Sequence, residues 1–290
     1  MFISAKWFGL LFSVAAAFYA TACWFLYSRQ TRMIFFPQAI IETTPADFQM
    51  NYQEVWLPVG APERSDKLHG WWIPALGEEK GVLLYLHGNG VNIGANVEHA
   101  HRFHRLGLSV LLIDYRGYGQ SRGAFPSEPQ VYEDATAAWQ YLTQARQIPA
   151  ERILIFGHSL GGAIAIQLAT QQPNAAGLIV QSSFTSIRQM IDRVPLYRIF
   201  PVEQLLTQRF DSIRKVSGLQ MPVLFIHGLV DSQVPAEMSR TLYRLSPQPK
   251  TIFLVPTAGH NNVALIAGED YLLTIQQFLQ QIRHAPQPQS

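Results

Sequence analysis

Six short runs of apolar and β-branched residues constrain the fold of this chain more than any other feature. Each run holds four to six such residues in succession, and most end at Gly, Asp or Ser. Continuous apolar runs are typical of strands that are buried on both faces of a parallel sheet. The runs are GVLLYLHG (81–88), SVLLIDYRG (109–117), RILIFGHS (152–159), GLIVQSS (177–183), PVLFIHG (222–228) and TIFLVP (251–256).

Helix-like stretches alternate with these runs, and the alternation predicts an α/β fold with an open, mostly parallel sheet in one domain. Two earlier segments, YQEVWLP (52–58) and LHGWWIPA (68–75), alternate polar and apolar residues and predict an antiparallel edge hairpin. Ligands of such sheets bind outside the carboxyl ends of the strands. The helix-like stretches lie near 92–106, 129–146, 160–172, 234–245 and 262–283.

The N-terminal segment 7–27 carries no charge and is long enough to cross the ~30 Å hydrocarbon core of a bilayer as a helix. Trp7, Trp24 and Tyr27 lie near its ends, where aromatic rings favour the lipid–water boundary. We therefore predict an uncleaved single-pass membrane anchor over residues 1–32.

Two alternatives to the anchor remain open at this point. One is a cleaved signal peptide with ATAC (20–23) as its cleavage site, and the other is a buried helix. Arg29 and Arg32 follow the segment, whereas Lys6 precedes it. The positive-inside bias then favours a cytoplasmic catalytic domain.

Charge and cysteine content exclude several classes of protein. The formal net charge of +2 without a run of like charges argues against nucleic-acid binding, which needs clustered Lys and Arg. The single cysteine excludes a disulfide framework and a thiolate zinc cluster. His99, His101 and His104 do not share one helix face, and the neighbouring arginines would repel a cation, so we predict no metal site there.

The stretch GHSLG fits the pattern G-x-S-x-G and lies between a predicted strand and a predicted helix. Such a turn is so tight that side chains at Gly157 and Gly161 would collide with nearby backbone. The turn lifts the hydroxyl of Ser159 above the sheet and aims a helix N-terminus at its target. We predict that Ser159 is a nucleophile; the alternative is a serine that only caps the helix.

A serine nucleophile needs a base, and in this kind of fold the acid and the histidine follow the serine in that order. Among the histidines after Ser159, His260 in PTAGHNN directly follows an apolar run, whereas His284 lies in the tail and His227 precedes the best acid. Asp231 is the one later carboxylate just past a predicted strand. We predict His260 as base and Asp231 as the acid that orients it.

The Gly-rich loop LYLHGNGVN (84–92) follows another predicted strand. We predict that the backbone N–H groups of Asn89 and Leu160 form an oxyanion hole. Segment 184–217 separates two predicted strands by more than a crossover needs and is predicted to form a small cap. Its apolar residues could line an acyl pocket or form the cap's own core.

The motifs HGNG, DYRGYGQS, GHSLGG, HGLVDSQVP and AGHNN, met in this order, resemble the α/β-hydrolase superfamily over about residues 33–282. An N-terminal anchor followed by MIFFPQ is similar to the membrane-anchored abhydrolase-type serine hydrolases, some of whose relatives remove fatty acyl groups from protein cysteines. The resemblance implies an eight-stranded sheet, a mechanism without cofactor, and a triad of Ser159, Asp231 and His260.

Together these features predict an anchor (1–32), an α/β-hydrolase domain (33–283) and a disordered tail (284–290). The expected function is a serine hydrolase that cleaves an ester or thioester of a small-molecule or lipid-derived acyl substrate through an acyl-enzyme. An acyltransferase with the same triad, a peptidase and a non-catalytic membrane-anchored adaptor are the alternatives. No cofactor, metal or nucleic-acid partner is expected.

Overall fold

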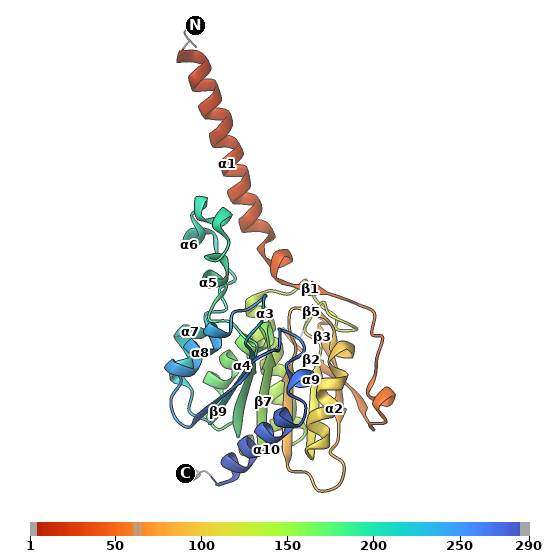
Figure 1. Ribbon diagram of the computed structural model, residues 1–290. Coiled ribbons are helices and arrows are strands. Elements are labelled where there is room, and N and C mark those ends of the chain that lie inside the picture. The colour runs from red at the N-terminus through yellow and green to blue at the C-terminus, as the bar shows by residue number, and fades with distance from the viewer. Residues whose placement is uncertain (1–4, 61–62, 64, 285–290) are drawn as a thin grey trace.

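The computed structural model describes residues 5–60, 63 and 65–284, and its centre is an eight-stranded sheet (Figure 1). The strand order is β10-β9-β8-β7-β4-β6-β3-β2; β3 runs antiparallel to both of its neighbours, β2 and β6, and all other neighbouring strands pair in parallel. The strands are β2 (Gln53–Pro58), β3 (Lys67–Ile73), β4 (Gly81–Leu86), β6 (Leu108–Ile113), β7 (Ile153–His158), β8 (Gly177–Gln181), β9 (Val223–Gly228) and β10 (Lys250–Val255).

All six apolar runs form the parallel part of this sheet, as predicted. Every residue of β4 and β6 is buried, because helices cover both faces of the sheet. The predicted edge hairpin is confirmed as β2 and β3, which pair antiparallel. The eight-stranded α/β-hydrolase fold expected from the sequence is therefore present.

Two hydrophobic cores lie on the two faces of the sheet. Helices α3, α4 and α8 pack on one face, and α2, α9 and α10 pack on the other (Figure 1). The adjacent Trp71 and Trp72 of β3 point into opposite cores, as alternation along a strand requires. These helices are α2 (Val97–Arg105), α3 (Glu128–Gln140), α4 (Leu160–Gln171), α8 (Ala236–Leu245), α9 (Val263–Ala267) and α10 (Glu269–His284).

Two predicted helices are divided in the structure. The stretch 262–283 breaks at Gly268, whose φ of +55° ends α9 before α10 begins. The stretch 92–106 starts as a 3-10 turn before α2. The short helical segments of the body are η1 (Pro45–Phe48), η2 (Ile93–Asn96), the π-helical η3 (Tyr141–Ala145) that extends α3, and η4 (Ala150–Arg152).

The N-terminal segment forms one continuous helix, α1 (Ala5–Ile34), which projects from the body of the molecule (Figure 1). Its Trp7–Ile34 portion, in which the most apolar stretch of 18 residues has a mean hydropathy of 1.7, is long and apolar enough to cross a membrane. The helix runs two residues past the predicted end of the anchor. The chain then enters β1 (Phe36–Pro37), which pairs with β5 (Gly90–Val91) beside the main sheet.

The segment between β8 and β9 holds only short helices, and α5 and α6 rise beside the lower part of α1 (Figure 1). We keep the name cap for residues 184–217. The division into anchor, catalytic domain and cap stays a prediction, and the predicted tail lies outside the described residues except for His284, where α10 ends. The helices of the cap are α5 (Ile187–Ile191), η5 (Pro195–Ile199), α6 (Val202–Leu205) and α7 (Ser212–Lys215), followed by η6 (Val216–Gly218).

Candidate active site

Ser159 lies at the turn between β7 and α4, with φ 54° and ψ −118°. A non-glycine residue rarely adopts this backbone conformation, and it persists only where the surrounding structure enforces it. The Ser159 N–H donates to Gln181 O of β8, and the Ser183 hydroxyl donates to Ser159 O. The end of β8 and the residues just after it thus hold the backbone of Ser159 at both its N–H and its carbonyl.

The flanking glycines are required by contacts with the backbone. A Cβ on Gly157 would lie 2.2 Å from Gly161 O, and one on Gly161 would lie 2.1 Å from Leu86 O. Both distances are far below van der Waals contact, and backbone atoms cannot rotate away. The steric reason predicted for the G-x-S-x-G spacing is confirmed.

The three side chains predicted to act together lie in one hydrogen-bonded chain. His260 Nε2 lies 2.9 Å from Ser159 Oγ, and His260 Nδ1 lies 2.7 Å from Asp231 Oδ2. Because an ionised carboxylate only accepts, Nδ1–H donates to Asp231 and the free Nε2 accepts from the serine hydroxyl. Ser159 and His260 each keep only 8% of their surface exposed, so the hydrogen bond between them is buried.

Asp231 accepts hydrogen bonds from four donors. Its Oδ1 receives the N–H groups of Gln233 and Val234, both at 2.8 Å. Its Oδ2 receives His260 and, at 3.1 Å, Nε2–H of His227. Burial raises the pKa of Asp231, but the hydrogen bonds from His227, His260 and Val234 outweigh it and hold the pKa well below its usual range. The carboxylate is therefore ionised at neutral pH.

His227 is a residue that sequence reasoning placed outside the site. Its ring contacts Asp231, whereas Ser159 is contacted by His260. Its Nε2–H also points at Val234 O (2.9 Å), while Ser239 Oγ lies 2.6 Å from Nδ1. The spacing HGLVD, with the histidine four residues before the acid, was the signal available in the sequence.

His158, the first unspecified position of the G-x-S-x-G pattern, is a second residue that sequence reasoning missed. Its Nε2 lies 3.2 Å from His260 O, and the two rings are 5.2 Å apart. Burial, with help from the nearby His260 and His99, lowers the pKa of His158 to about 3. A neutral His158 therefore supports the backbone of His260 without placing a second positive charge beside it.

Asn89 lies in the loop that passes beside Ser159. A Cβ on the preceding residue, Gly88, would lie 3.5 Å from Ser159 Cβ. The Asn89 carbonyl accepts from the Phe36 N–H (2.9 Å) and the Tyr118 hydroxyl (2.6 Å). Its side-chain amide donates to Ile34 O at 2.8 Å. Asn89 is thus fixed through both its carbonyl and its side chain.

The predicted oxyanion donors are available for a ligand. Leu160 is the first residue of α4, where an N–H has no partner inside the helix. Within the described part of the chain, neither the Asn89 N–H nor the Leu160 N–H reaches a protein acceptor. Their role as an oxyanion hole stays a prediction.

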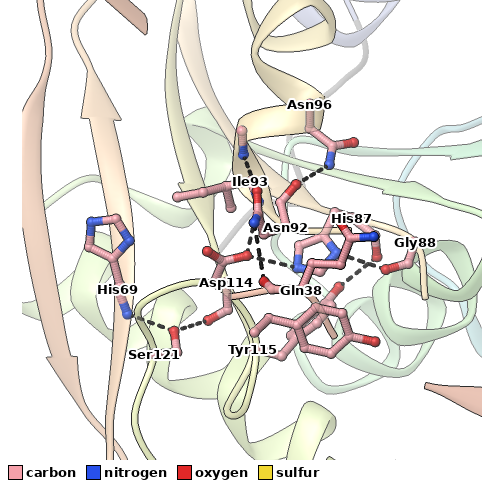
Figure 2. Close-up of polar contacts among 12 residues, drawn as sticks. Gln38, His69, His87, Gly88, Asn92, Ile93, Asn96, Asp114, Tyr115 and Ser121 are labelled. Carbon is pink, nitrogen blue, oxygen red and sulfur yellow. Dashed lines mark hydrogen bonds and ion pairs between the residues drawn. The ribbon is translucent and has the colours of Figure 1, made fainter. Parts of the chain in front are cut away.

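A buried polar network holds the loop that carries Asn89 in place (Figure 2). Tyr115 OH donates to His87 O, Nδ1–H of His87 donates to Gly88 O, and Asp114 Oδ1 accepts from the Ile93 N–H. His87 Nε2 lies 3.5 Å from Asp114 Oδ1, and neither side chain has exposed surface. Burial raises the pKa of Asp114 to about 8 and lowers that of His87 to about 4, so this pair is neutral at pH 7. Asp114 thus orders the loop through its hydrogen bond with the Ile93 N–H.

The three histidines set aside as a metal site point to different partners. His99 faces His158, His101 packs on Phe48, and His104 contacts Pro74 O. Across the described residues, no group of three or more His, Cys, Asp or Glu side chains is placed to hold a metal ion.

Comparisons with known proteins agree with this architecture. The family model described as "Serine aminopeptidase, S33" matches residues 77–215. Protein bem46 of Schizosaccharomyces pombe is 34% identical over 88% of this chain and 87% of its own length. An uncharacterised protein of Mycobacterium tuberculosis is 37% identical over 88% of this chain and 89% of its own.

A solved structure has the same fold. The esterase Pf2001 of Pyrococcus furiosus superposes with a TM-score of 0.69 at 20% identity, covering 86% of this chain and 97% of its own. A further relative, the alpha/beta hydrolase domain-containing protein WAV2 of Arabidopsis thaliana, is 31% identical over 84% of this chain and 83% of its own. This chain belongs to the α/β-hydrolase family.

Proposed function

We propose that the protein is a membrane-anchored serine hydrolase that cleaves a carboxylic ester or thioester through an acyl-enzyme on Ser159. The observation that carries this proposal is the hydrogen-bonded chain from Asp231 through His260 to the strained Ser159. A serine that only capped a helix would need neither the strain nor the histidine.

In the proposed reaction, Ser159 Oγ attacks the substrate carbonyl carbon while its proton passes to His260 Nε2. The ionised Asp231 stabilises the resulting imidazolium, and the N–H groups of Asn89 and Leu160 receive the negative oxygen. The tetrahedral intermediate expels the leaving group, which takes the proton from Nε2. Water then attacks the acyl-serine, gives one proton to His260, and releases the acid as Ser159 recovers its proton.

The anchor is part of the proposal, and it is supported by α1. This helix is apolar, projects from the body, and has the length needed for a bilayer. The arginines that follow its charge-free run favour a catalytic domain on the cytoplasmic side.

The direct test is hydrolysis of p-nitrophenyl esters from acetate to palmitate by the full-length protein and by Ser159→Ala. We expect the variant to lose about 10⁶-fold in kcat, the usual effect of removing such a nucleophile. Labelling by a serine-reactive fluorophosphonate should occur in the wild type and disappear in the variant. Full activity of Ser159→Ala would refute the proposal.

The same assay separates the alternatives. An adaptor would neither be labelled nor turn over any ester. An acyltransferase would form the acyl-enzyme but transfer the acyl group to an added alcohol or amine in preference to water. A peptidase would cleave aminoacyl p-nitroanilides faster than the matching acyl esters.

A further inference from the structure

The tip of the cap touches the middle of the charge-free run of α1. The Tyr19 hydroxyl donates to Ile199 O at 2.8 Å, and the Tyr19 ring stacks on Phe200 with centroids 5.7 Å apart. Tyr19 lies near the centre of the run between Lys6 and Arg29, about 15 Å along the helix from Arg29. If α1 crosses a bilayer whose hydrocarbon core is ~30 Å thick, the tip of the cap lies within that core too.

The surface of the tip fits this environment. Leu196 and Ile199 are 67% and 61% exposed, although a water-facing surface loop normally displays polar groups. Arg198 lies between them, and its long side chain can extend its charge towards the lipid headgroups. The apolar tip thus has no protein partner among the described residues beyond its contact with α1.

Four charged residues of the cap pair with one another, whereas Arg193 contacts the carbonyl of Gln233 instead. Arg188 contacts Asp192 and lies 3.4 Å from Glu203, which in turn lies 2.7 Å from Arg209. These pairs reduce the cost of placing the cap near a membrane, because unpaired charges are expensive to remove from water.

An apolar groove of about 260 Å³ separates α1 from the cap. Gln30 is the one amide side chain in its wall, and the other residues there are apolar apart from the Tyr197 hydroxyl. The wall from α1 includes Leu26, Met33 and Ile34, and the wall from the cap includes Ile187, Met190 and Leu205.

One residue in each wall of the groove is connected to the candidate active site, by a hydrogen bond or by a short stretch of chain. Ile34 O accepts the side-chain amide of Asn89, the predicted oxyanion residue. Ile187 follows, by four residues, Ser183, whose hydroxyl donates to Ser159 O. The proposal below places the carboxyl end of an acyl chain at this end of the groove.

We propose that cap residues 194–200 form a second membrane contact, inserted into the leaflet beside α1, and that the groove opens sideways into the bilayer and takes the acyl chain of a membrane lipid. This inference rests on the proposed anchor and hydrolase activity. It goes beyond them because a simple tether would leave the cap in water.

The insertion is testable without catalysis. In full-length protein with Cys23→Ala, a nitroxide label is attached to Phe18→Cys, Leu196→Cys or Leu76→Cys, and the protein is placed in phosphatidylcholine vesicles. Phe18 is an exposed α1 position, and Leu76 is a leucine more exposed than Leu196, in the turn before β4 at the opposite end of the parallel strands. Electron paramagnetic resonance then compares collision rates with oxygen, which enriches in lipid, and with a water-soluble nickel chelate.

We expect the labels at positions 18 and 196 to collide more often with oxygen, and the label at position 76 to collide more often with the nickel chelate. A lipid-exposed 18 with a water-exposed 196 would overturn the insertion while leaving the anchor intact. A water-exposed 18 would overturn the anchor, and the inference with it.

The groove is tested by filling it with Met190→Trp, with Leu76→Trp as the matched control. Wild-type kcat/KM should rise with acyl length, and Met190→Trp should lower it at least tenfold for palmitate and less than twofold for acetate. Unchanged acetate turnover also shows that the variant is folded. Equal losses for both esters, or no loss for palmitate, would overturn the groove as the acyl site.

Discussion

Two histidine–carboxylate pairs lie at the carboxyl edge of the same sheet, and they differ in the charge they carry. Asp231 accepts four hydrogen bonds, and its pKa is held below the usual range. Asp114 accepts one backbone N–H and lies 3.5 Å from His87, and its pKa is raised to about 8. The number of donors, rather than the residue types, decides which pair is ionised.

The difference matches what each pair is proposed to do. A carboxylate that stabilises a transient imidazolium must be charged before the reaction, and so must have its donors in place. A pair that only orders a loop is stable without charge, since an ionised group without enough donors would cost several kcal/mol on burial. The most direct tests of this contrast replace the carboxyl group of each pair by an amide.

Asp231→Asn should have the largest effect, because it makes the first pair neutral like the second. The amide cannot stabilise a protonated His260 and can favour the wrong tautomer. We expect kcat for p-nitrophenyl acetate to fall about 10⁴-fold. The measurement is steady-state hydrolysis at pH 7.

Asp114→Asn is the matched control for that substitution, because it removes a carboxyl that is already neutral at pH 7. Its kcat should stay within about tenfold of wild type. A loss at Asp114→Asn as large as that at Asp231→Asn would show that the two pairs do not differ in the way proposed.

Some residues of the candidate site were predictable from the sequence, and some of the contacts around Asp231 were not. Residues directly after apolar runs were predictable site residues, because parallel strands deliver their carboxyl ends to one edge. Ser159, Asp231 and His260 were therefore named correctly as neighbours, although their roles stay predictions. The order of residues along the chain excluded His227 as the base. It could not show that Asp231 accepts hydrogen bonds from two histidine rings, those of His227 and His260.

The cap and α1 were less predictable for a physical reason. Helices of four or five residues separated by Pro195 and Pro201 carry too little periodicity to reveal which face packs where. The contact of Tyr19 with Ile199 joins residues 180 positions apart through a backbone carbonyl, which every residue type offers. Gly268 was a visible signal for the break between α9 and α10, but Gly within a helical pattern is also tolerated.

His227→Phe should have an intermediate effect, because it takes one donor from Asp231 and leaves Ser239 without its ring partner. We expect kcat to fall about tenfold and the free energy of unfolding at pH 6 to fall by about 2 kcal/mol. His227→Gln, which can restore a donor, should recover part of both.

The pH dependence distinguishes this positioning role from simple packing. A lowered carboxyl pKa stabilises the fold above the unfolded value of about 4, and that stabilisation is lost as the pH falls. The stability difference between wild type and His227→Phe should therefore shrink from pH 6 to pH 3. A difference that does not change with pH would mean that His227 acts through packing alone.

The smallest expected effect on activity is that of Asp114→Asn, and its effect on stability changes with pH in the direction opposite to that at Asp231. A carboxyl whose pKa is about 8 in the folded state and about 4 unfolded holds an extra proton when folded, so wild type loses stability as pH rises from 4 to 8. The amide cannot titrate, so the melting temperature of Asp114→Asn should gain on wild type over this range. With these two pKa values the relative gain is about 1.4 kcal/mol for each pH unit well between them, and each kcal/mol corresponds to roughly 2–4 °C in a protein of this size. If the difference in melting temperature between wild type and Asp114→Asn stays constant from pH 5 to pH 8, Asp114 is ionised in the folded protein. The neutral character of the second pair would then have to be abandoned.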